Sequence, residues 1–289
     1  MKEIQKNIAI FLSVLMLMCS LPISNVLALE SQVNFYSSNA STFDEATPDE
    51  IIDNCGYDAY WSLDTKTGVL TIWGSGIIED YTINRYNNTN NSPWCLYNDL
   101  IKKVIIDGTI TSIGANAFYG CQNLTEITIP DSVSEISDSA FYNCNNLNKV
   151  NISDISEWLN IDFSSYSSNP LNYGSSLYLN NQLVTKLIIP YGITEINDFA
   201  FSGCESLTEI AIPDSVTSIG DCVFCSCLKL SKITIPNSVT SIGHSAFNGC
   251  ESLTEIEIPD GVTSIKNYTF ENCINLAGVT IGNSVENIE

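Results

Sequence analysis

The sequence predicts an α/β repeat fold, a solenoid of short stacked turns, and two observations on the 289-residue chain lead to this prediction. The octapeptide GCESLTEI stands at residues 203–210 and again, unchanged, at residues 249–256, which is 46 positions later. Several residue types also recur every 23 residues, half that distance, with one interruption between residues 151 and 186. These columns hold Phe at 118, 141, 201, 224, 247 and 270, Cys at 121, 144, 204, 227, 250 and 273, and Leu at 124, 147, 207, 230, 253 and 276. Fixed periods of this size are typical of solenoids.

One unit of the repeat combines a short strand, a turn and a closing apolar pair. In the unit that contains the second copy of the octapeptide, Ile256 and Ile258 alternate with polar residues, which is the period of a strand with one buried face. Pro259 has no amide donor, so the strand ends there and Pro-Asp-Gly turns the chain. Phe270 and Cys273 close the unit at roughly helical spacing. Because one unit is too small to bury its own apolar residues, stacked units bury them together, with a parallel sheet on one side and short turns or helices on the other.

The first 28 residues have the pattern of a secretory signal peptide. Lys2 and Lys6 precede the apolar run of residues 8–18, and Ala28 supplies a small residue at the expected cleavage position. The run is shorter than the roughly 20 apolar residues that cross a bilayer. We therefore expect a secreted chain with no membrane insertion after signal cleavage. Residues 29–53 are polar and acidic, which predicts a flexible linker.

Residues 54–100 differ from the repeat and predict a small β-rich N-terminal cap. Two alternating apolar segments flank residues 65–68, a hairpin signal with glycine at the turn. Ser92 followed by Pro93 predicts the start of a short helix. We expect tryptophan rings to cover the first turn, because terminal repeats need a cap, and the alternative is an aromatic platform that binds sugars. The rings are those of Trp61, Trp73 and Trp94.

The interruption between residues 151 and 186 predicts an insert in the solenoid, which otherwise spans residues 101–289. One step of the columns is 37 residues there instead of 23. Asp154 and Glu157 form a capping-box pattern at the start of a short amphipathic segment. Asn180 and Asn181 predict a hairpin, since asparagine tolerates positive φ. Loops of this kind can carry specificity, but we expect a tolerated insertion that leaves the stack continuous.

The C-terminal unit lacks its closing half. It supplies Val279, Ile281, Val285 and Ile288 but no following phenylalanine and cysteine before Glu289. Apolar side chains would then face water. We expect this end to be frayed, paired or continued by further chain, and pairing would make the protein self-associate through its open C-terminal turn.

The charge of the chain excludes some classes of partner. The formal net charge is −22, and removal of residues 1–28 leaves 9 basic and 32 acidic residues. Such a surface repels phosphate backbones and anionic lipids, so we expect no nucleic-acid partner. The simplest role of the acidic residues is to keep a secreted protein soluble.

The ten cysteines that follow the leader favour packing over chemistry. Six lie in one column at a fixed step, and a small apolar thiol suits such a buried position. The spacing Cys222-x-x-Cys225-x-Cys227 resembles a metal clip, but Cys227 belongs to the packing column, so we predict no metal site. Disulfide formation is an open alternative, because strands about 4.8 Å apart lie within the separation that a disulfide spans. Cys55 with Cys95 is the first pair to examine.

The sequence gives little support for catalysis. His244 is the one histidine, and its column is variable and polar, so we expect a solvated loop residue. A nucleophile activated by histidine would depend on it alone. We predict that the protein is not an enzyme and uses no cofactor.

The repeat unit resembles the BspA-like class of leucine-rich repeats, over roughly residues 101–289. The pattern L-x-x-I-x-I matches the leucine-rich repeat, and IPDSVTSIGDCVFCSC at residues 212–227 looks like the BspA-like class. The resemblance implies a right-handed leucine-rich-repeat solenoid with a short parallel sheet on its concave side. It also implies a secreted or surface-displayed bacterial protein with a protein-binding role of the adhesion type.

The concave side is the expected binding surface, because solenoids typically bind through it. Its outward positions alternate in charge along the stack, and a ladder of exposed salt bridges, each worth little, explains most of that pattern. We expect an extracellular protein or glycan to bind there. The alternatives are a self-associating component of an envelope or matrix and a glycan-binding module of a degradative system. The residues assigned to the face are Lys103, Glu126, Thr128, Lys149, Asn151, Lys186, Thr208, Glu209, Lys232, Thr234, Glu255 and Glu257.

Overall fold

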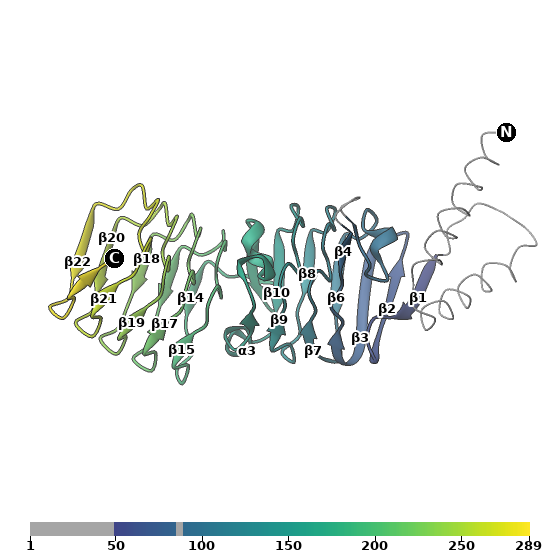
Figure 1. Cartoon of the computed structure of the whole chain (residues 1–289), viewed down its shortest axis with the longest axis horizontal. Helices are drawn as coiled ribbons and strands as arrows, with labels where there is room; N and C mark the ends of the chain where they lie inside the picture. The colour runs from purple at the N-terminus through teal and green to yellow at the C-terminus, as the bar shows by residue number, and fades with distance from the viewer. Residues whose placement is uncertain (1–48, 85–88) are drawn as a thin grey trace, which may run out of the picture. The chain divides into compact units, whose positions relative to one another are not determined.

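The computed structural model describes residues 49–84 and 89–289, and this part of the chain is a solenoid with two parallel rows of strands (Figure 1). The expected signal peptide lies outside the described residues, as does most of the expected linker. The first row contains β6 (Lys103–Ile106), β8 (Glu126–Thr128), β10 (Lys149–Ile152), β12 (Ser176–Leu179), β14 (Lys186–Ile188), β16 (Glu209–Ala211), β18 (Lys232–Thr234), β20 (Glu255–Ile258) and β22 (Gly278–Ile281). The second row contains β7 (Thr109–Ile113), β9 (Glu135–Ile136), β11 (Asp162–Phe163), β15 (Glu195–Ile196), β17 (Ser218–Ile219), β19 (Ser241–Ile242), β21 (Ser264–Ile265) and β23 (Asn287–Ile288).

The register of the strands follows the 23-residue period of the sequence. In the first row, Lys186 pairs with Glu209 and Glu209 with Lys232, each one repeat apart. Ile210, in the middle of β16, is buried, whereas its two neighbours in the strand are not. The alternation in sequence therefore places one side chain per strand in the core and two on the outer surface. The predicted repeat fold is confirmed.

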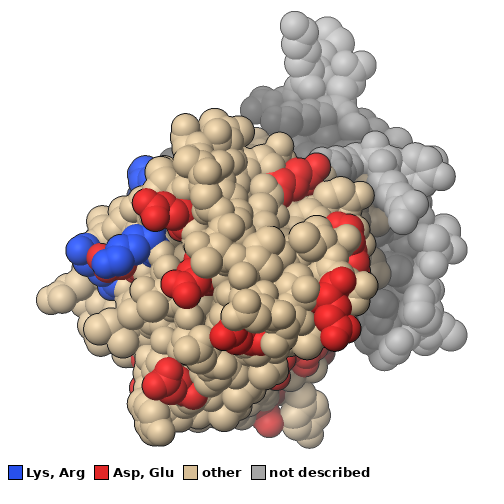
Figure 2. All heavy atoms as spheres, turned by 90° about the vertical axis from the view of Figure 1, so that its left-hand side faces the viewer, with Lys and Arg blue, Asp and Glu red and all other residues tan. Residues whose placement is uncertain are grey.

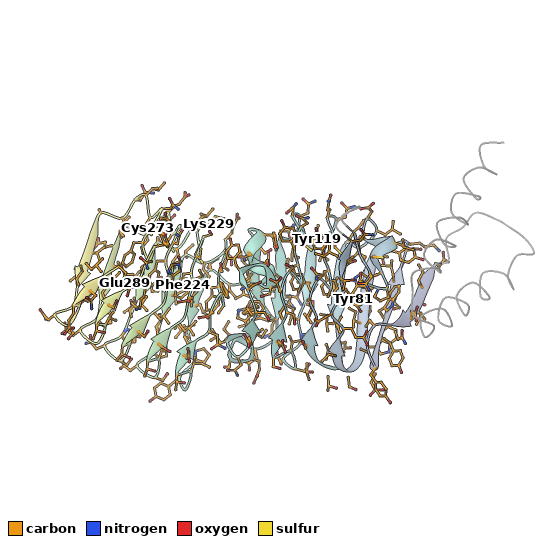
Figure 3. The ribbon with its side chains drawn as sticks, in the orientation of Figure 1. Tyr81, Tyr119, Phe224, Lys229, Cys273 and Glu289 are labelled. Atoms are coloured by element: carbon orange, nitrogen blue, oxygen red, sulfur yellow. The ribbon has the colours of Figure 1, made fainter. Side chains whose placement is uncertain are left out.

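The phenylalanine column forms the centre of the core. Successive rings stack nearly parallel, with centroids 5.3 Å apart between Phe118 and Phe141 and 5.5 Å apart between Phe224 and Phe247. Phe224 is fully buried inside the coil (Figure 3). Offset stacks of this kind add to the free energy that burial of each ring contributes. The columns read from the sequence are thus columns in space.

The cysteine column packs against the same rings. The thiol of Cys144 donates a hydrogen bond to the carbonyl of Phe118, and that of Cys250 donates to Phe224, at 3.1 and 3.2 Å. All ten cysteines of the described residues, Cys55 and Cys95 among them, are unpaired in the structure. Four column thiols, those of Cys144, Cys227, Cys250 and Cys273, thus donate to the phenylalanine carbonyl of the preceding turn. The thiol of Cys121 instead donates to Asn98 Oδ1, and the Cys204 sulfur lies 3.4 Å from the Ser206 hydroxyl.

The N-terminal cap contains the predicted hairpin. Strands β2 (Asp58–Asp64) and β3 (Val69–Ile78) pair antiparallel around the turn at residues 65–68, and β3 continues both rows by pairing with β6 and β7. Strand β1 (Glu50–Asn54) pairs with β2, so the linker expected up to residue 53 ends sooner. The two-residue strands β4 (Ile83–Asn84) and β5 (Thr89–Asn90) pair beside the cap. The helix expected from Ser92 is only the 3-10 turn η1 (Cys95–Tyr97), which begins after Trp94.

Two of the three tryptophans act as the expected cap. Trp61 and Trp94 are buried and meet edge to face, and the Trp94 ring stacks on Phe118 at 5.5 Å. The Trp94 indole N–H donates to the carbonyl of Ala117. Trp73 does not contribute, because strand alternation turns it to the opposite side of β3, where it stacks against Tyr60 at 6.3 Å. The prediction that Trp73 caps the first turn was wrong.

The interruption at residues 151–186 is a longer turn followed by a hairpin. Strand β10 pairs with β12, 27 residues later, and the turn between them contains α3 (Ile155–Leu159), β11 and the 3-10 turns η2 (Tyr166–Ser168) and η3 (Pro170–Tyr173). The side chain of Asp154 caps α3 by accepting from the amide of Ser156. The predicted hairpin is confirmed, since Asn180 and Asn181 have φ of 51° and 63° between β12 and β13 (Gln182–Leu183). The stack therefore has an extra, irregular turn where a simple insertion was expected.

The core stays continuous across this junction although the strand ladders do not. Among the described residues, no ladder joins β14 to β12 or β15 to β11. Trp158, which is buried, instead donates its indole N–H to the carbonyl of Ala200 at 2.9 Å. This contact repeats the one that Trp94 makes with Ala117, so each run of phenylalanines begins with a buried tryptophan bound to the alanine before the first ring.

The last turn is formed but poorly covered. Strands β22 and β23 pair with β20 and β21 of the preceding turn. The side chains of Val279, Ile281 and Ile288 are 36%, 45% and 69% exposed. The expected exposure of apolar residues is confirmed, and self-association through this turn stays a prediction. Among the described residues, no helix is long and apolar enough to span a bilayer.

Candidate binding face

The outer surface of the first strand row carries the predicted face residues, and we call this surface the lysine face. Its lysines are Lys103, Lys149, Lys186 and Lys232, which are four of the nine basic residues after position 28. In an end view, the visible basic side chains gather on one flank, whereas acidic side chains are spread over the rest (Figure 2). The strands of the first row hold four lysines and four glutamates, so this surface is less acidic than the chain as a whole.

The lysines of the face lie in two triads, each with a glutamate between two lysines. In the first triad, Glu126 Oε1 lies 2.9 Å from the ammonium of Lys103 and 3.3 Å from that of Lys149. The three side chains are only 23–36% exposed. Partial burial works to raise the pKa of Glu126, but the hydrogen bonds and charges of the two lysines outweigh it, so the pKa is lowered.

The β12–β13 hairpin covers one end of the first triad. The ammonium of Lys149 donates to Asn181 Oδ1 at 2.9 Å and lies 5.1 Å from the centre of the Tyr178 ring. Asn151 is only 8% exposed, and its side-chain oxygen accepts from the backbone amide of Asn181. Asn151 was predicted to contact a partner, and this prediction was wrong because the residue holds the hairpin turn.

The hairpin also separates the two triads. The register places Ser176 of β12, and no residue of β14, beside Lys149. Lys149 and Lys186 were expected to be consecutive members of one column. They are not, because the extra turn and the hairpin stand between them.

The second triad is open to solvent. Glu209 contacts Lys186 at 2.8 Å and Lys232 at 2.9 Å through its two separate carboxylate oxygens. The lysine side chains are 72% and 67% exposed. Hydrogen bonds from Lys186 and Lys232, together with their charges, lower the pKa of Glu209 to about 2. Each lysine uses one contact to hold the glutamate and keeps its other donors for an incoming acceptor.

Some hydroxyl groups beside the triads are already used within the solenoid. Thr208, a predicted face residue, donates its hydroxyl to the backbone carbonyl of Thr185 at 2.9 Å, and Ser231 donates in the same way to Thr208. Thr128 and Thr234 lie two residues beyond the charged residue of their strands and face outward, opposite Asn151 and Ala211 respectively. The polar column next to the lysines thus joins successive turns, and Thr128 and Thr234 lie in the column that stays on the outer surface.

A depression opens on the lysine face next to the second triad. Among the described residues, no ladder joins β18 to β20, although the turns that follow remain bonded, as in the contact from the Phe247 amide to the Thr269 carbonyl. The two strands splay, and Ile233 is only half-buried. The depression has a volume of about 640 Å³, and its lining residues are Ser231, Lys232, Ile233, Thr254, Glu255, Ile256, Glu257 and Thr280. Two of its eight lining residues, Ile233 and Ile256, are apolar, and the other six are polar or charged.

The remaining candidate chemistry is weak. Cys227 is buried and donates its thiol to the carbonyl of Phe201, so it is not free to join Cys222 and Cys225 as a metal ligand. Among the described residues, no group of three or more potential ligands is placed to hold a metal ion. His244 is exposed, as predicted, and lies edge-on to Tyr268. That the protein is not an enzyme stays a prediction.

Comparison with known proteins identifies the repeat. The family described as BspA type Leucine rich repeat region matches residues 90–175 and 171–289, with six copies. The chain belongs to this family. A search of curated proteins found no match.

Several solved structures are similar to this leucine-rich repeat protein. A leucine-rich repeat protein from Eubacterium ventriosum is 22% identical, with 80% of this chain and 84% of that chain covered and a TM-score of 0.35. The T. pallidum leucine-rich repeat protein is 24% identical, with coverages of 82% and 86% and a TM-score of 0.36. A leucine-rich cell surface protein from Faecalibacterium prausnitzii is 19% identical, with coverages of 82% and 95% and a TM-score of 0.34.

Proposed function

We propose that this leucine-rich repeat protein is secreted or displayed on a bacterial surface, where it binds an extracellular protein through the part of the lysine face between β14 and β22. The observation that carries the proposal is the open second triad next to the depression. It combines two solvent-exposed ammonium groups with a mainly polar hollow in which Ile233 is half-buried. The leader-like pattern of residues 1–28 supports an extracellular location.

The chemistry of this region indicates what the partner presents. Carboxylates of the partner would meet Lys186 and Lys232, which still have free donors beside Glu209. An apolar side chain would enter the depression above Ile233, while Glu255 and Glu257 on its rim select for a nearby basic group. A protein segment with mixed charges and one apolar anchor fits this pattern.

The test is a pull-down followed by a titration. The chain from residue 29 onward would first capture a partner from host-matrix and bacterial-surface extracts. The affinity of the purified partner would then be measured for Lys186→Ala/Lys232→Ala and for the control Lys66→Ala/Lys229→Ala, which makes the same charge change outside the strand rows. We expect the first variant to lose at least about tenfold in affinity and the control to stay near wild type. An equal effect in both variants, or none in the first, contradicts the proposal.

The exposed pair Tyr60–Trp73 favours a second candidate, which is glycan binding. Tyr60 is 44% exposed and Trp73 half-exposed, and their rings are stacked at an interplanar angle of 28°. Flat aromatic surfaces with a polar edge suit ligands that are apolar on one face. If a glycan array gives signals that Trp73→Ala abolishes and Lys186→Ala/Lys232→Ala leaves intact, this second candidate replaces the first.

A further inference from the structure

Cys222 and Cys225 lie together in one tight turn outside the cysteine column. The backbone amide of Cys225 donates to the carbonyl of Cys222 at 3.1 Å, and Cys222 has a φ of 53°. In a turn with this hydrogen bond the two Cα atoms are less than about 7 Å apart, which is close to the range that a disulfide spans. Hydrogen bonds to the next repeat hold this tight turn in place, because the amides of Cys222 and Phe224 donate to the carbonyls of His244 and Ala246 at 2.9 Å.

The two thiols share one turn and differ from those of the column. Their mutual interaction is the largest influence on the pKa of each, and both side chains are only half-buried. The Ser226 hydroxyl lies 3.9 Å from the Cys225 sulfur, and the Ser202 hydroxyl donates to the backbone carbonyl of Cys225 at 3.4 Å. The column thiols, in contrast, are mostly buried and bonded to backbone carbonyls, as Cys250 is. Among the ten cysteines of the described residues, only Cys222 and Cys225 share a hydrogen-bonded turn in which both side chains are half-buried.

The fold does not require cysteine at either position. The matching pairs in the other turns are Asn116 with Tyr119, Ser139 with Tyr142, Phe199 with Ser202, Ser245 with Asn248 and Tyr268 with Glu271. All six residues at the first position have positive φ, so the turn has the same shape whatever side chain it carries. A packing role therefore does not explain why two cysteines occur together here.

We propose that Cys222 and Cys225 form a thiol–disulfide exchange site, which low-molecular-weight disulfides oxidise to an intramolecular disulfide. This site is independent of the lysine face.

The exchange proceeds in two displacements that balance. The Cys225 thiolate attacks one sulfur of the small disulfide, so the small S–S bond breaks, a mixed disulfide forms and one small thiolate leaves. Cys222 then gives its proton to water or the leaving thiolate and attacks the Cys225 sulfur, which releases the second small thiol. The two protein thiols lose two electrons, and the small disulfide gains them.

The electrostatics of the pair favour this order of attack. Hydrogen bonds, above all that from Cys222, lower the pKa of Cys225 to about 7, against the effect of partial burial. The same contact and burial raise the pKa of Cys222. The thiolate is the nucleophile in exchange, so Cys225 attacks first and Cys222 resolves the intermediate. Tyr166 of η2 borders the site, since burial and then the nearby Cys225 and Cys222 raise the pKa of its hydroxyl.

The test is oxidation of the folded protein with oxidised glutathione, followed by alkylation and peptide mass spectrometry. We expect the peptide that contains Cys222 and Cys225 to lose two hydrogen atoms and to resist alkylation, while the buried column cysteines are unchanged. Before oxidation, iodoacetamide at neutral pH should modify Cys225 roughly tenfold faster than a thiol of ordinary pKa. Two free thiols at these positions after prolonged oxidation, or a disulfide that maps to another pair, would overturn the proposal.

Two substitutions copied from the next turn separate the roles. Cys222→Ser should stop at a mixed disulfide between Cys225 and glutathione, because no resolving thiol remains. Cys225→Asn should leave Cys222 largely unmodified. The opposite pattern, or equal labelling of both variants, would contradict the assigned order. Ser245 and Asn248 occupy these positions one turn later, so both variants are expected to fold, and circular dichroism checks this.

Discussion

The two triads of the lysine face have the same sequence pattern and different surroundings. Glu126 and its lysines are partly buried, and Asn181 and Tyr178 of the β12–β13 hairpin contact Lys149. Glu209 and its lysines lie on a bare strand row next to a depression. One pattern therefore serves two purposes, a structural brace in the first case and an open surface in the second. Whether a neighbouring segment covers the triad decides which of the two purposes it serves.

The largest expected loss of stability comes from a substitution at the junction between the two runs of turns, which lies between the two triads. Trp158 is 1% exposed and links the runs through Ala200, so Trp158→Ala should destabilise the protein by about 3–5 kcal/mol. Trp158→Phe keeps one aromatic ring and loses the hydrogen bond and part of the buried ring system, so it should cost less than Trp158→Ala, about 1–3 kcal/mol. Urea unfolding measures both, with exposed His244→Ala as a control that changes little. Equal unfolding midpoints for Trp158→Ala and His244→Ala would show that the runs do not depend on this residue.

The hairpin turn offers a smaller and more local change. Asn180→Ala/Asn181→Ala places alanine at two positive-φ positions and removes the Asn181 acceptor of Lys149, so we expect a loss of about 1–3 kcal/mol. Lys149 should then react faster with an acylating reagent, at a rate closer to that of Lys186. Asn180→Gly/Asn181→Gly relieves the φ strain but still lacks the acceptor. It should expose Lys149 to the reagent with less destabilisation, and an unchanged Lys149 rate in both variants would show that the hairpin does not protect it.

The smallest expected effect concerns pH. Because the pKa of Glu209 falls from 4.5 to about 2 in the folded protein, the unfolded state binds the proton more readily. Its contribution to stability is therefore fully present above pH 4.5 and is lost as the pH falls toward 2. Glu209→Gln should unfold with a weaker pH dependence than wild type in that range. Solvent and salt reach Glu209, so the difference should be small and shrink at high ionic strength. A difference that appears only near neutral pH would contradict the assignment.

The stacked columns could be predicted from sequence because they are local and periodic. Phe118, Phe141 and Phe224 occupy the same place in each turn, and a fixed step in sequence becomes a fixed step in space. The hairpin at Asn180 and Asn181 was likewise predictable, since few residue types tolerate its backbone conformation.

The details of the face were less predictable, because they depend on contacts between segments far apart in the chain. The residues around Asn151 in the sequence do not indicate that the amide of Asn181 will donate to its side chain. The step of 37 residues concealed a turn of 27 residues and a hairpin. The depression at Ile233 comes from strands that splay although their sequences fit the repeat. For Trp73 a signal did exist, because it is out of phase with buried Leu70 and Ile72 on the same strand.

The alternation of charge along the lysine face sets a rule for how a solenoid of this sequence can change length. Removal of the one turn that carries Lys232 would bring Glu209 beside Glu255, two carboxylates at neighbouring register positions, which repel each other. Removal of two consecutive turns would preserve the order of signs. The octapeptide that stands at residues 203–210 and 249–256 recurs at this same two-turn distance. Lengthening or shortening in pairs of turns is thus the change that the surface tolerates without a clash of like charges.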